Sequence, residues 1–384
     1  MAQSSVTITG VMDAGYQSGN EYGQRATTVV QNGSRTTAIK FIGVEDLGAG
    51  LKAKFQFEAD PAITAANGNS NNAYIKADSR AYANGAAQSG NTASAQSGLV
   101  GAGYNYVALE SATLGQIEFG TINTNALATQ GLGAQKFGTA IGSGYKKIWA
   151  ELTRYENALK YTTPTIAGFN ASVLSGVGNN SAYGSTTTVT LRRPAVQELG
   201  LNYANGPVAV GYSHLESKTS GNEAVVSATA AAASDVTTKY DTFAATYDFG
   251  VAKVGYGLQN AKNNAGFDTA STPLSHALDT KAQMLTVTAP YGNWLFLANS
   301  GSRKTNAQGG AAAVQTALNG QKSTFTGLGA HYNFSKNTYA YVMYESAKMN
   351  DADMTAIVIN GVAGSNTTSD RTRSVTAIGL STAF

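Results

Sequence analysis

Segments of about ten residues in which apolar and polar side chains alternate recur along the whole chain, and this feature most limits what it can fold into. The clearest segment spans residues 51–58, where Leu, Ala, Phe and Phe alternate with Lys, Lys, Gln and Glu. Successive side chains of a β-strand point to opposite faces, so each segment predicts a strand with one apolar and one polar face. A tilted strand of about nine to eleven residues is long enough to cross the hydrocarbon core of a membrane.

The segments are joined alternately by short turns and by long polar loops. Typical short turns lie at 45–50, 205–207 and 335–337. The first strand is expected over 6–14, followed by a loop rich in Gly, Asn and Gln that reaches about Thr36. The pattern indicates about sixteen strands, with about seven short turns and about eight long loops. It predicts an all-β fold for residues 1–384: a single-domain, transmembrane antiparallel β-barrel of about 16 strands, with long extracellular loops and short periplasmic turns.

The positions of proline and of the aromatic residues agree with this barrel. All six prolines fall at turns, in loops or beside them, because proline lacks the N–H that a central strand needs. A soluble β-sandwich would show the same alternation, but it seldom needs so many strands with long loops on one side only. Aromatic residues gather beside the turns, where the girdle at a membrane interface would need them: Phe249, Tyr291, Trp294, Phe334 and Tyr339.

The composition excludes several other classes of protein. Charged residues make up 13% of the chain, about half of what a soluble domain carries. No run of 18 or more apolar residues occurs, which excludes a helical membrane protein. The net charge of +3 is too small and too dispersed for a nucleic-acid-binding protein. Cysteine is absent, so the chain has neither disulfide bonds nor thiolate sites.

Sequence motifs of enzymes and metal sites are also missing. The three histidines, His214, His276 and His331, lie on different segments, and no two of them have the spacing of metal ligands. No GxSxG elbow, HExxH motif or P-loop occurs, and 131–134 lacks the glycine spacing of a dinucleotide site. We therefore predict that the chain is not an enzyme, with no catalytic residues, no metal site and no cofactor.

At several places the sequence resembles the general porins of the Gram-negative outer membrane, closest to the β-proteobacterial type. The resemblance extends from one end of the chain to the other. The start at Met1, Ala2 and Gln3 is expected to lie near a mature N-terminus, without a signal peptide. The segments that carry the resemblance are Ser4-Ser5-Val6-Thr7, residues 45–53 (EDLGAGLKA), residues 157–164 (NALKYTTP), residues 247–253 (YDFGVAK), and the terminal Phe384 in register with Ile378 and Leu380.

This resemblance implies a homotrimer of sixteen-stranded barrels in the outer membrane, each with its own water-filled pore. In the family the third long loop folds into the pore and narrows it, and here this constriction loop is expected at approximately 122–156. Phe384 is expected to be the C-terminal signal that the barrel assembly machinery reads. The other implied partners are the lipids and lipopolysaccharide of the outer membrane, and small hydrophilic solutes and anions.

The alternation assigns side chains to the lumen. Lys40, Lys54 and Lys160 are expected near mid-height, where the loop should narrow the pore. Arg373 should point inward higher up the last strand, and Asp13 should lie at similar depth on the first strand. Two positions that carry arginine in the family are Gly103 and Thr121 here, so we expect a mild rather than a strong preference for anions. The candidate residues for constriction and selectivity are Lys40, Lys54, Lys160, Arg373, Asp13, Glu151, Arg154 and Glu156.

Three functions are compatible with such a barrel. A channel for passive diffusion needs only a polar constriction with a mild charge bias. A substrate-selective channel for small anionic or aromatic solutes needs a ladder of binding groups, for which Tyr106, Tyr339 and Tyr341 are candidates. A structural or adhesive surface barrel would use the long loops at 60–103 and 305–321. The diffusion porin is the reading that the residues and the resemblance favour.

Overall fold

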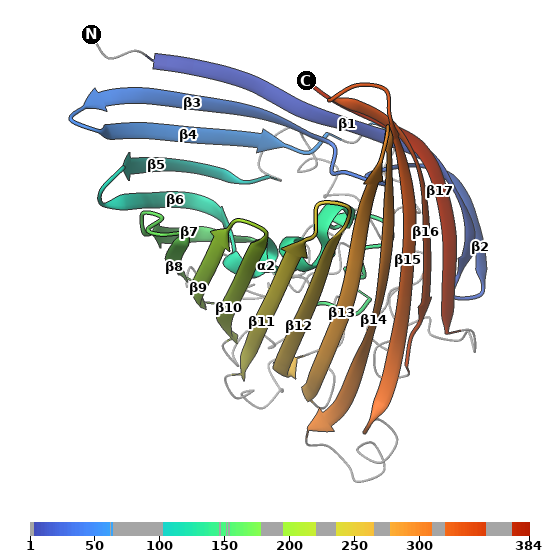
Figure 1. The fold of residues 1–384 in the computed structure, drawn as a ribbon. Coiled ribbons are helices and arrows are strands. Elements are labelled where there is room, and N and C mark those ends of the chain that lie inside the picture. The colour runs from blue at the N-terminus through green and yellow to red at the C-terminus, as the bar shows by residue number, and fades with distance from the viewer. Residues whose placement is uncertain are drawn as a thin grey trace, which may run out of the picture.

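The strands of the protein form one sheet of antiparallel pairs that closes on itself (Figure 1), because the last strand pairs with the first. The predicted antiparallel barrel is therefore confirmed. The structure is a computed structural model, and the residues that it describes are 4–61, 63, 103–145, 147–150, 152, 154–177, 195–219, 236–264, 277–308, 319–350 and 371–384.

The described residues contain 17 labelled strands, which fill sixteen positions around the barrel. β2 pairs with residues 14–21 of β1, and β3 pairs with residues 4–11 of the same strand. These two strands therefore lie end to end and share one position. The strands are β1 (Ser4–Glu21), β2 (Gln24–Gln31), β3 (Ala38–Gly48), β4 (Leu51–Ala59), β5 (Asn105–Ser111), β6 (Gly115–Asn123), β7 (Arg154–Thr162), β8 (Phe169–Gly176), β9 (Ala195–Asn205), β10 (Val208–Thr219), β11 (Val236–Asp248), β12 (Lys253–Asn264), β13 (Ala277–Tyr291), β14 (Trp294–Gln308), β15 (Gln321–Asn333), β16 (Thr338–Lys348) and β17 (Thr372–Ala383).

The region that was expected to be the first loop is largely strand. β1 continues to Glu21 and turns at Tyr22 and Gly23 into β2, so the predicted loop from residue 15 to about Thr36 is wrong over most of its length. Alternation does continue here, since the exposed side chains of Tyr16 and Val29 lie opposite each other on the outer face. Small and polar residues surround them, and the apolar signal is too sparse to be recognised from sequence.

Large apolar side chains cover the outside of the barrel. On β9 and β14, for example, Leu199, Leu201 and Phe296 are exposed, while the residues between them are buried or smaller. Exposed apolar side chains that alternate along every wall are expected where a barrel faces lipid. Among the described residues, no helix is long and apolar enough to cross a membrane.

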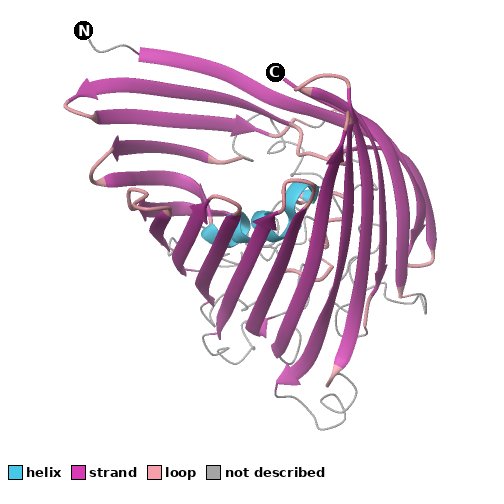
Figure 2. Ribbon diagram, in the orientation of Figure 1, coloured by secondary structure: helices cyan, strands magenta, loops and turns pink. Residues whose placement is uncertain are grey.

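The buried apolar residues lie inside the barrel, where the segment that connects β6 to β7 packs against the inner side of the wall. This segment contains helix α2 (Asn125–Ala134) and the 3-10 turn η2 (Gln135–Phe137), and Figure 2 shows both within the ring of strands. Phe137, Ile148 and Trp149 of the segment form one cluster with inward side chains such as Met284 and Met343. We call residues 124–152 the inward segment. Its place agrees with the loop expected at approximately 122–156.

Candidate pore constriction

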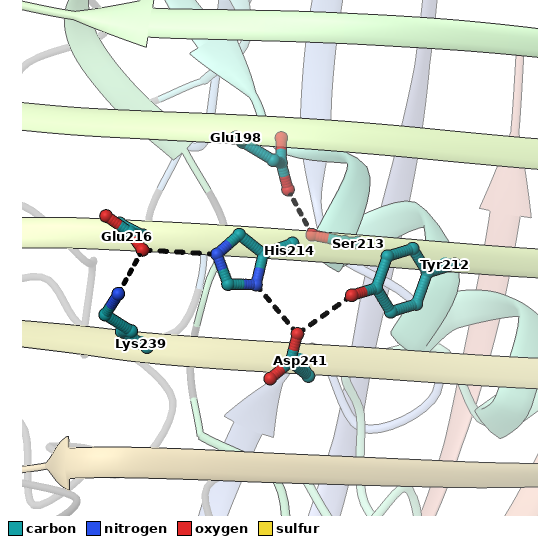
Figure 3. A network of polar contacts seen from close by, with 7 residues as sticks. All are labelled: Glu198, Tyr212, Ser213, His214, Glu216, Lys239 and Asp241. Atoms are coloured by element: carbon teal, nitrogen blue, oxygen red, sulfur yellow. Dashed lines mark hydrogen bonds and ion pairs between the residues drawn. The ribbon is translucent and has the colours of Figure 1, made fainter.

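The inward segment begins at a helix N-terminus held by a carboxylate of the wall. Thr124 caps α2, because its hydroxyl accepts a hydrogen bond of 3.0 Å from the backbone N–H of Leu127. The carboxylate of Glu198 on β9 accepts from the N–H groups of Asn125 and Ala126, each at 2.7 Å. Ser213 on β10 donates to the same carboxylate at 2.7 Å (Figure 3). A negative charge at this end also interacts favourably with the helix dipole, so β9 and β10 fix where the segment starts.

Two close approaches hold the rest of the segment against the wall. The ring of Trp149 lies over Gly257 of β12, where an added Cβ would meet the ring at 2.3 Å. The backbone at Gly142 lies against Gly327 of β15, where an added Cβ would meet a carbonyl oxygen at 2.1 Å. Asn299 of β14 donates to that carbonyl at 3.1 Å. Glycines in the wall thus let backbone and a large ring approach at distances that any larger side chain would prevent.

A buried charge cluster joins the inward segment to β16 and β17. Glu345 accepts a hydrogen bond of 2.9 Å from the N–H of Gly142 and lies 3.4 Å from the ammonium group of Lys147. The guanidinium of Arg373 also pairs with this carboxylate, and the whole Arg373 residue is only 2% exposed. Arg373 therefore points inward as predicted, but its charge is compensated by Glu345 and covered by the segment.

Asp13 is likewise buried, and it holds the residues between β2 and β3. Its carboxylate accepts hydrogen bonds from the N–H of Gly33 at 2.8 Å and of Arg35 at 3.0 Å, and from the hydroxyl of Tyr341 at 3.0 Å. The expectation that Asp13 and Arg373 lie at similar depth is wrong. In the β1–β17 register Asp13 is opposite Ser381, eight residues from Arg373, which corresponds to about 26 Å along the strand.

Lysines and glutamates alternate across the wall formed by β3 to β7. The register places Lys54 and Lys160 in one row across the strands, with Glu118 beside Lys160. Lys40 lies 3.0 Å from Glu58, and Lys54 pairs with Glu110. Lys160 instead donates to the backbone carbonyl of Asn123, at 3.1 Å. Two of the three predicted lysines are therefore neutralised locally by carboxylates.

Arg35 and Lys136 are lumen cations that the sequence analysis did not select. Arg35 lies over the ring of Tyr339, 5.9 Å from its centroid, and Lys136 is exposed on η2. Neither forms an ion pair with a carboxylate among the described residues. No local pattern could identify them, since Arg35 was expected in a surface loop and the position of Lys136 depends on the path of the inward segment.

Comparison with known proteins identifies the family of this barrel. The model of the Gram-negative porin family matches residues 1–352. The chain belongs to the Gram-negative porins. An outer membrane porin protein of Bordetella pertussis is 26% identical over 358 residues, which cover 85% of this porin and 81% of that protein. Outer membrane porin protein 32 of Delftia acidovorans is 26% identical over 397 residues, 100% of this porin and 95% of that protein.

Solved structures agree with the porin fold. An anion-selective porin from Comamonas acidovorans superposes with a TM-score of 0.69 at 22% identity, and the match covers 100% of both chains. The trimer form of an outer membrane protein of Vibrio cholerae gives a TM-score of 0.63 at 15% identity, over 99% of both chains. The protein is therefore an outer-membrane porin, with the family and fold of a channel rather than of an enzyme.

The remaining candidate residues of this porin fall in different surroundings. Arg154 begins β7 opposite Asn123, and Glu156 is half-buried two residues farther along the strand. Glu151 lies outside the described residues. The aromatic candidates are mostly covered: Tyr106 is half-buried against Tyr104, whereas Tyr339 and Tyr341 are 9% and 3% exposed.

Proposed function

We propose that this porin is a water-filled channel for passive diffusion of small hydrophilic solutes and ions, with a mild preference for anions and no catalytic activity. The observation that supports the charge preference is the distribution of ion pairs in the lumen. Lys40 and Lys54 are balanced by Glu58 and Glu110, whereas the side-chain cations of Arg35, Lys136 and Lys160 form no ion pair among the described residues, although Glu118 lies directly opposite Lys160. Unbalanced positive charge in a narrow passage with low-dielectric walls raises the local concentration of anions.

The same balance supports a mild preference rather than a strong one. Two unit charges about 4 Å apart interact by only about 1 kcal/mol in water, and more in a narrow lumen. Three cations without partners therefore favour anions several-fold without excluding cations. The candidate set for selectivity stays Lys40, Lys54, Lys160, Arg373, Asp13, Glu151, Arg154 and Glu156, and we add Arg35 and Lys136. Within that set we propose that Arg373 and Asp13 act mainly by holding the segments that shape the lumen.

We propose that the functional unit is a homotrimer in the outer membrane. The trimer form of the Vibrio cholerae protein supports this arrangement. Further proposed partners are lipopolysaccharide around the barrel and the barrel assembly machinery, which would read the C-terminal Phe384. Phe384 ends the strand that closes the sheet, because its backbone exchanges two hydrogen bonds with Gly10, of 3.0 Å and 3.1 Å.

The test of the diffusion function is liposome swelling with the purified porin and neutral sugars of increasing size. A diffusion channel admits all of them at rates set by size alone. Passage of one class of anionic or aromatic solute only would support the substrate-selective channel instead. Absence of passage by a correctly folded trimer would leave the structural or adhesive role. A reversal potential across a KCl gradient then measures the preference for anions.

A further inference from the structure

The outer surface of β10 to β16 carries one exposed lysine on each strand, near the end opposite the short turns. These lysines share the face of the exposed apolar side chains, for example Lys281 with Leu285 on β13 and Lys322 with Leu328 on β15. They therefore point away from the lumen and take no part in the constriction. We call the set the outer lysine row: Lys218, Lys239, Lys262, Lys281, Lys304, Lys322 and Lys348.

The strand register brings these lysines next to one another. Lys239 is directly opposite Lys262, and Lys304 is directly opposite both Lys281 and Lys322. Directly opposed side chains have Cβ atoms about 5 Å apart, and like charges at this distance destabilise a sheet. The row thus contains three directly opposed lysine pairs on the outer face of the barrel, and each pair is unfavourable unless an anion lies between the two ammonium groups.

Among the described residues, carboxylates form ion pairs with the row at one end only, although Asp279 lies on the same face two residues from Lys281. At β10 and β11, Lys239 donates to Glu216 at 2.6 Å, and His214 bridges Glu216 at 3.3 Å and Asp241 at 2.7 Å (Figure 3). Toward β16 the lysines of the row have fewer carboxylates near them. Lys281, Lys304, Lys322 and Lys348 form no ion pair with any residue that the structure describes. The positive charge is therefore concentrated on β13 to β16.

The height of the row corresponds to one edge of the membrane. Lys281, Lys304 and Lys322 each lie ten residues from an aromatic residue at a short turn, which is Tyr291, Trp294 and Tyr332 respectively. Ten residues span about 33 Å along a strand, or about 25 Å of height at a tilt near 40°. This equals the height of the apolar band of an outer-membrane barrel, so the ammonium groups lie at the level of lipid headgroups on the far side.

We propose that the outer lysine row binds the phosphate groups of lipopolysaccharide in the outer leaflet. This proposal rests on the proposed function, because a porin in the outer membrane has the ends of its strands opposite the short turns at that leaflet. A phosphate between two opposed lysines replaces repulsion by two charge-assisted contacts. The acyl chains of the same molecule would then lie along exposed apolar residues below the row, such as Leu285, Phe296 and Leu328.

The row occupies one sector of the barrel, which is why we infer a binding surface rather than a general excess of surface charge. On β17 and β1 the outward positions toward the same end are Ser374, Thr372, Ser18 and Asn20, all uncharged, and on β2 the exposed Arg25 opposite Asn20 is a single cation. A soluble anion would need only the lysines. Continuity of the lysines with an apolar surface favours a lipid that carries phosphate and acyl chains together.

The experiment compares three forms of the full-length porin in detergent micelles, with binding of purified lipopolysaccharide measured by native mass spectrometry. The first is the wild type, and the second is the triple variant Lys281→Gln/Lys304→Gln/Lys322→Gln. The third is a matched control, Lys52→Gln/Lys253→Gln/Lys336→Gln, which removes the same charge beside the short turns. The row variant should bind roughly tenfold to a hundredfold more weakly, since each lysine near an anionic headgroup contributes to affinity. The control should bind like the wild type.

Additional ligands and one further variant show which chemical group is bound and whether weaker binding is caused by misfolding. Dephosphorylated lipopolysaccharide should bind weakly to all forms, and inorganic phosphate should compete poorly. The triple Lys→Arg variant of the row should keep the affinity, because it keeps the charge. Equal binding by the wild type and the row variant, or full competition by inorganic phosphate, would overturn the proposal. Single-channel conductance and ion preference should be the same in the wild type and in both row variants, because the row lies outside the lumen, so failure of the diffusion function would be recognised separately.

Discussion

The electrostatic field in the lumen of this porin depends on which lumen cations have a carboxylate beside them. Lys40 and Lys54 point into the lumen, but Glu58 and Glu110 lie next to them. Lys160 donates to the carbonyl of Asn123 and forms no ion pair, although Glu118 lies directly opposite it on β6. Replacement of a paired lysine therefore leaves an uncompensated glutamate, whereas replacement of an unpaired cation only removes a positive charge. This difference makes the contributions of individual residues measurable.

The triple variant Lys40→Glu/Lys54→Glu/Lys160→Glu should shift the reversal potential toward cations. The change replaces three positive charges by three negative ones, next to glutamates that lose their partners. We expect the permeability ratio to change at least several-fold, and the effect to fall with salt, since the screening length drops from about 10 Å at 0.1 M to about 3 Å at 1 M. The measurement is the reversal potential across a KCl gradient. An unchanged potential would mean that these lysines do not set the field, and would direct attention to Glu151 and Glu156.

The double variant Arg35→Gln/Lys136→Gln should lower the preference for anions without reversing it. Neither side chain has a carboxylate partner among the described residues, so neutralisation exposes no new negative charge. We expect a change of roughly twofold to fivefold in the permeability ratio, less than in the triple variant. Lys336→Gln, in a short turn outside the lumen, is the matched control. If the control has the same effect as the double variant, the two lumen cations have no special role.

At the scale of elements, the inward segment is held against the wall at its start, at Gly142 and at Trp149. Glu198 binds the start of α2, and Glu345 binds the backbone at Gly142. The backbone of Gly142 and the ring of Trp149 also lie directly on the wall glycines Gly327 and Gly257. The diameter of the pore is therefore controlled by a few close approaches that a single methyl group can prevent.

Gly327→Ala should widen the pore. An added Cβ would lie 2.1 Å from the carbonyl oxygen of Gly142 and 2.6 Å from its Cα, so the inward segment must move away from β15. We expect a higher single-channel conductance and a loss of about 1–3 kcal/mol of stability, as for other overpacked sites. Gly329→Ala is the control on the same strand and face. Its Cβ meets the flexible Met343 side chain at 2.7 Å instead of the segment, so conductance should be unchanged.

At the scale of the whole molecule, the barrel is closed by pairing between the first and the last strand. β1 and β17 pair over residues 11–21 and 373–383. The terminal Phe384 extends this closure by its two backbone bonds to Gly10, and the hydroxyl of Thr9 donates to its carbonyl at 2.6 Å. The Phe384 ring lies over Gly10, with no room for a Cβ there. An unpaired last strand would leave an exposed edge until the barrel closes.

Phe384→Ser should lower the amount of porin that reaches the outer membrane. The ring that packs over Gly10 is lost, and the terminal strand loses the aromatic residue expected to be recognised during assembly. Quantitative immunoblotting of outer-membrane fractions measures this amount, and the conductance of porin that does assemble should be normal. Wild-type levels of the variant would contradict the assignment of Phe384 as a signal.

The porin should migrate as a trimer that dissociates on heating. Trimer association leaves each barrel intact, so samples kept cold in mild detergent should run at about three times the monomer mass, with a β-dominated far-UV spectrum. Seminative electrophoresis before and after heating checks this. Monomeric behaviour in several mild detergents would contradict the proposed homotrimer.

The sequence by itself determined the architecture of this porin, because the alternation of side chains along a strand is a local property. Leu285 and Val287, for example, can be assigned to the outer face because they alternate with Thr286 and Thr288, which are buried. The inward direction of Lys40, Lys54, Lys160 and Arg373 follows from the same rule. The local rule was insufficient for residues 15–21 of β1 and for β2, where few apolar residues carry the pattern.

Only the tertiary structure decided which charges of the lumen remain unbalanced. The pairing of Lys40 with Glu58, the burial of Arg373 beside Glu345, and the depth of Asp13 all depend on how separate strands are aligned. Register is set by contacts between residues that are distant in sequence, and one position of shift changes every partner. The path of the inward segment depends further on packing of Trp149 and Gly142 against far strands, which no periodicity within the segment encodes.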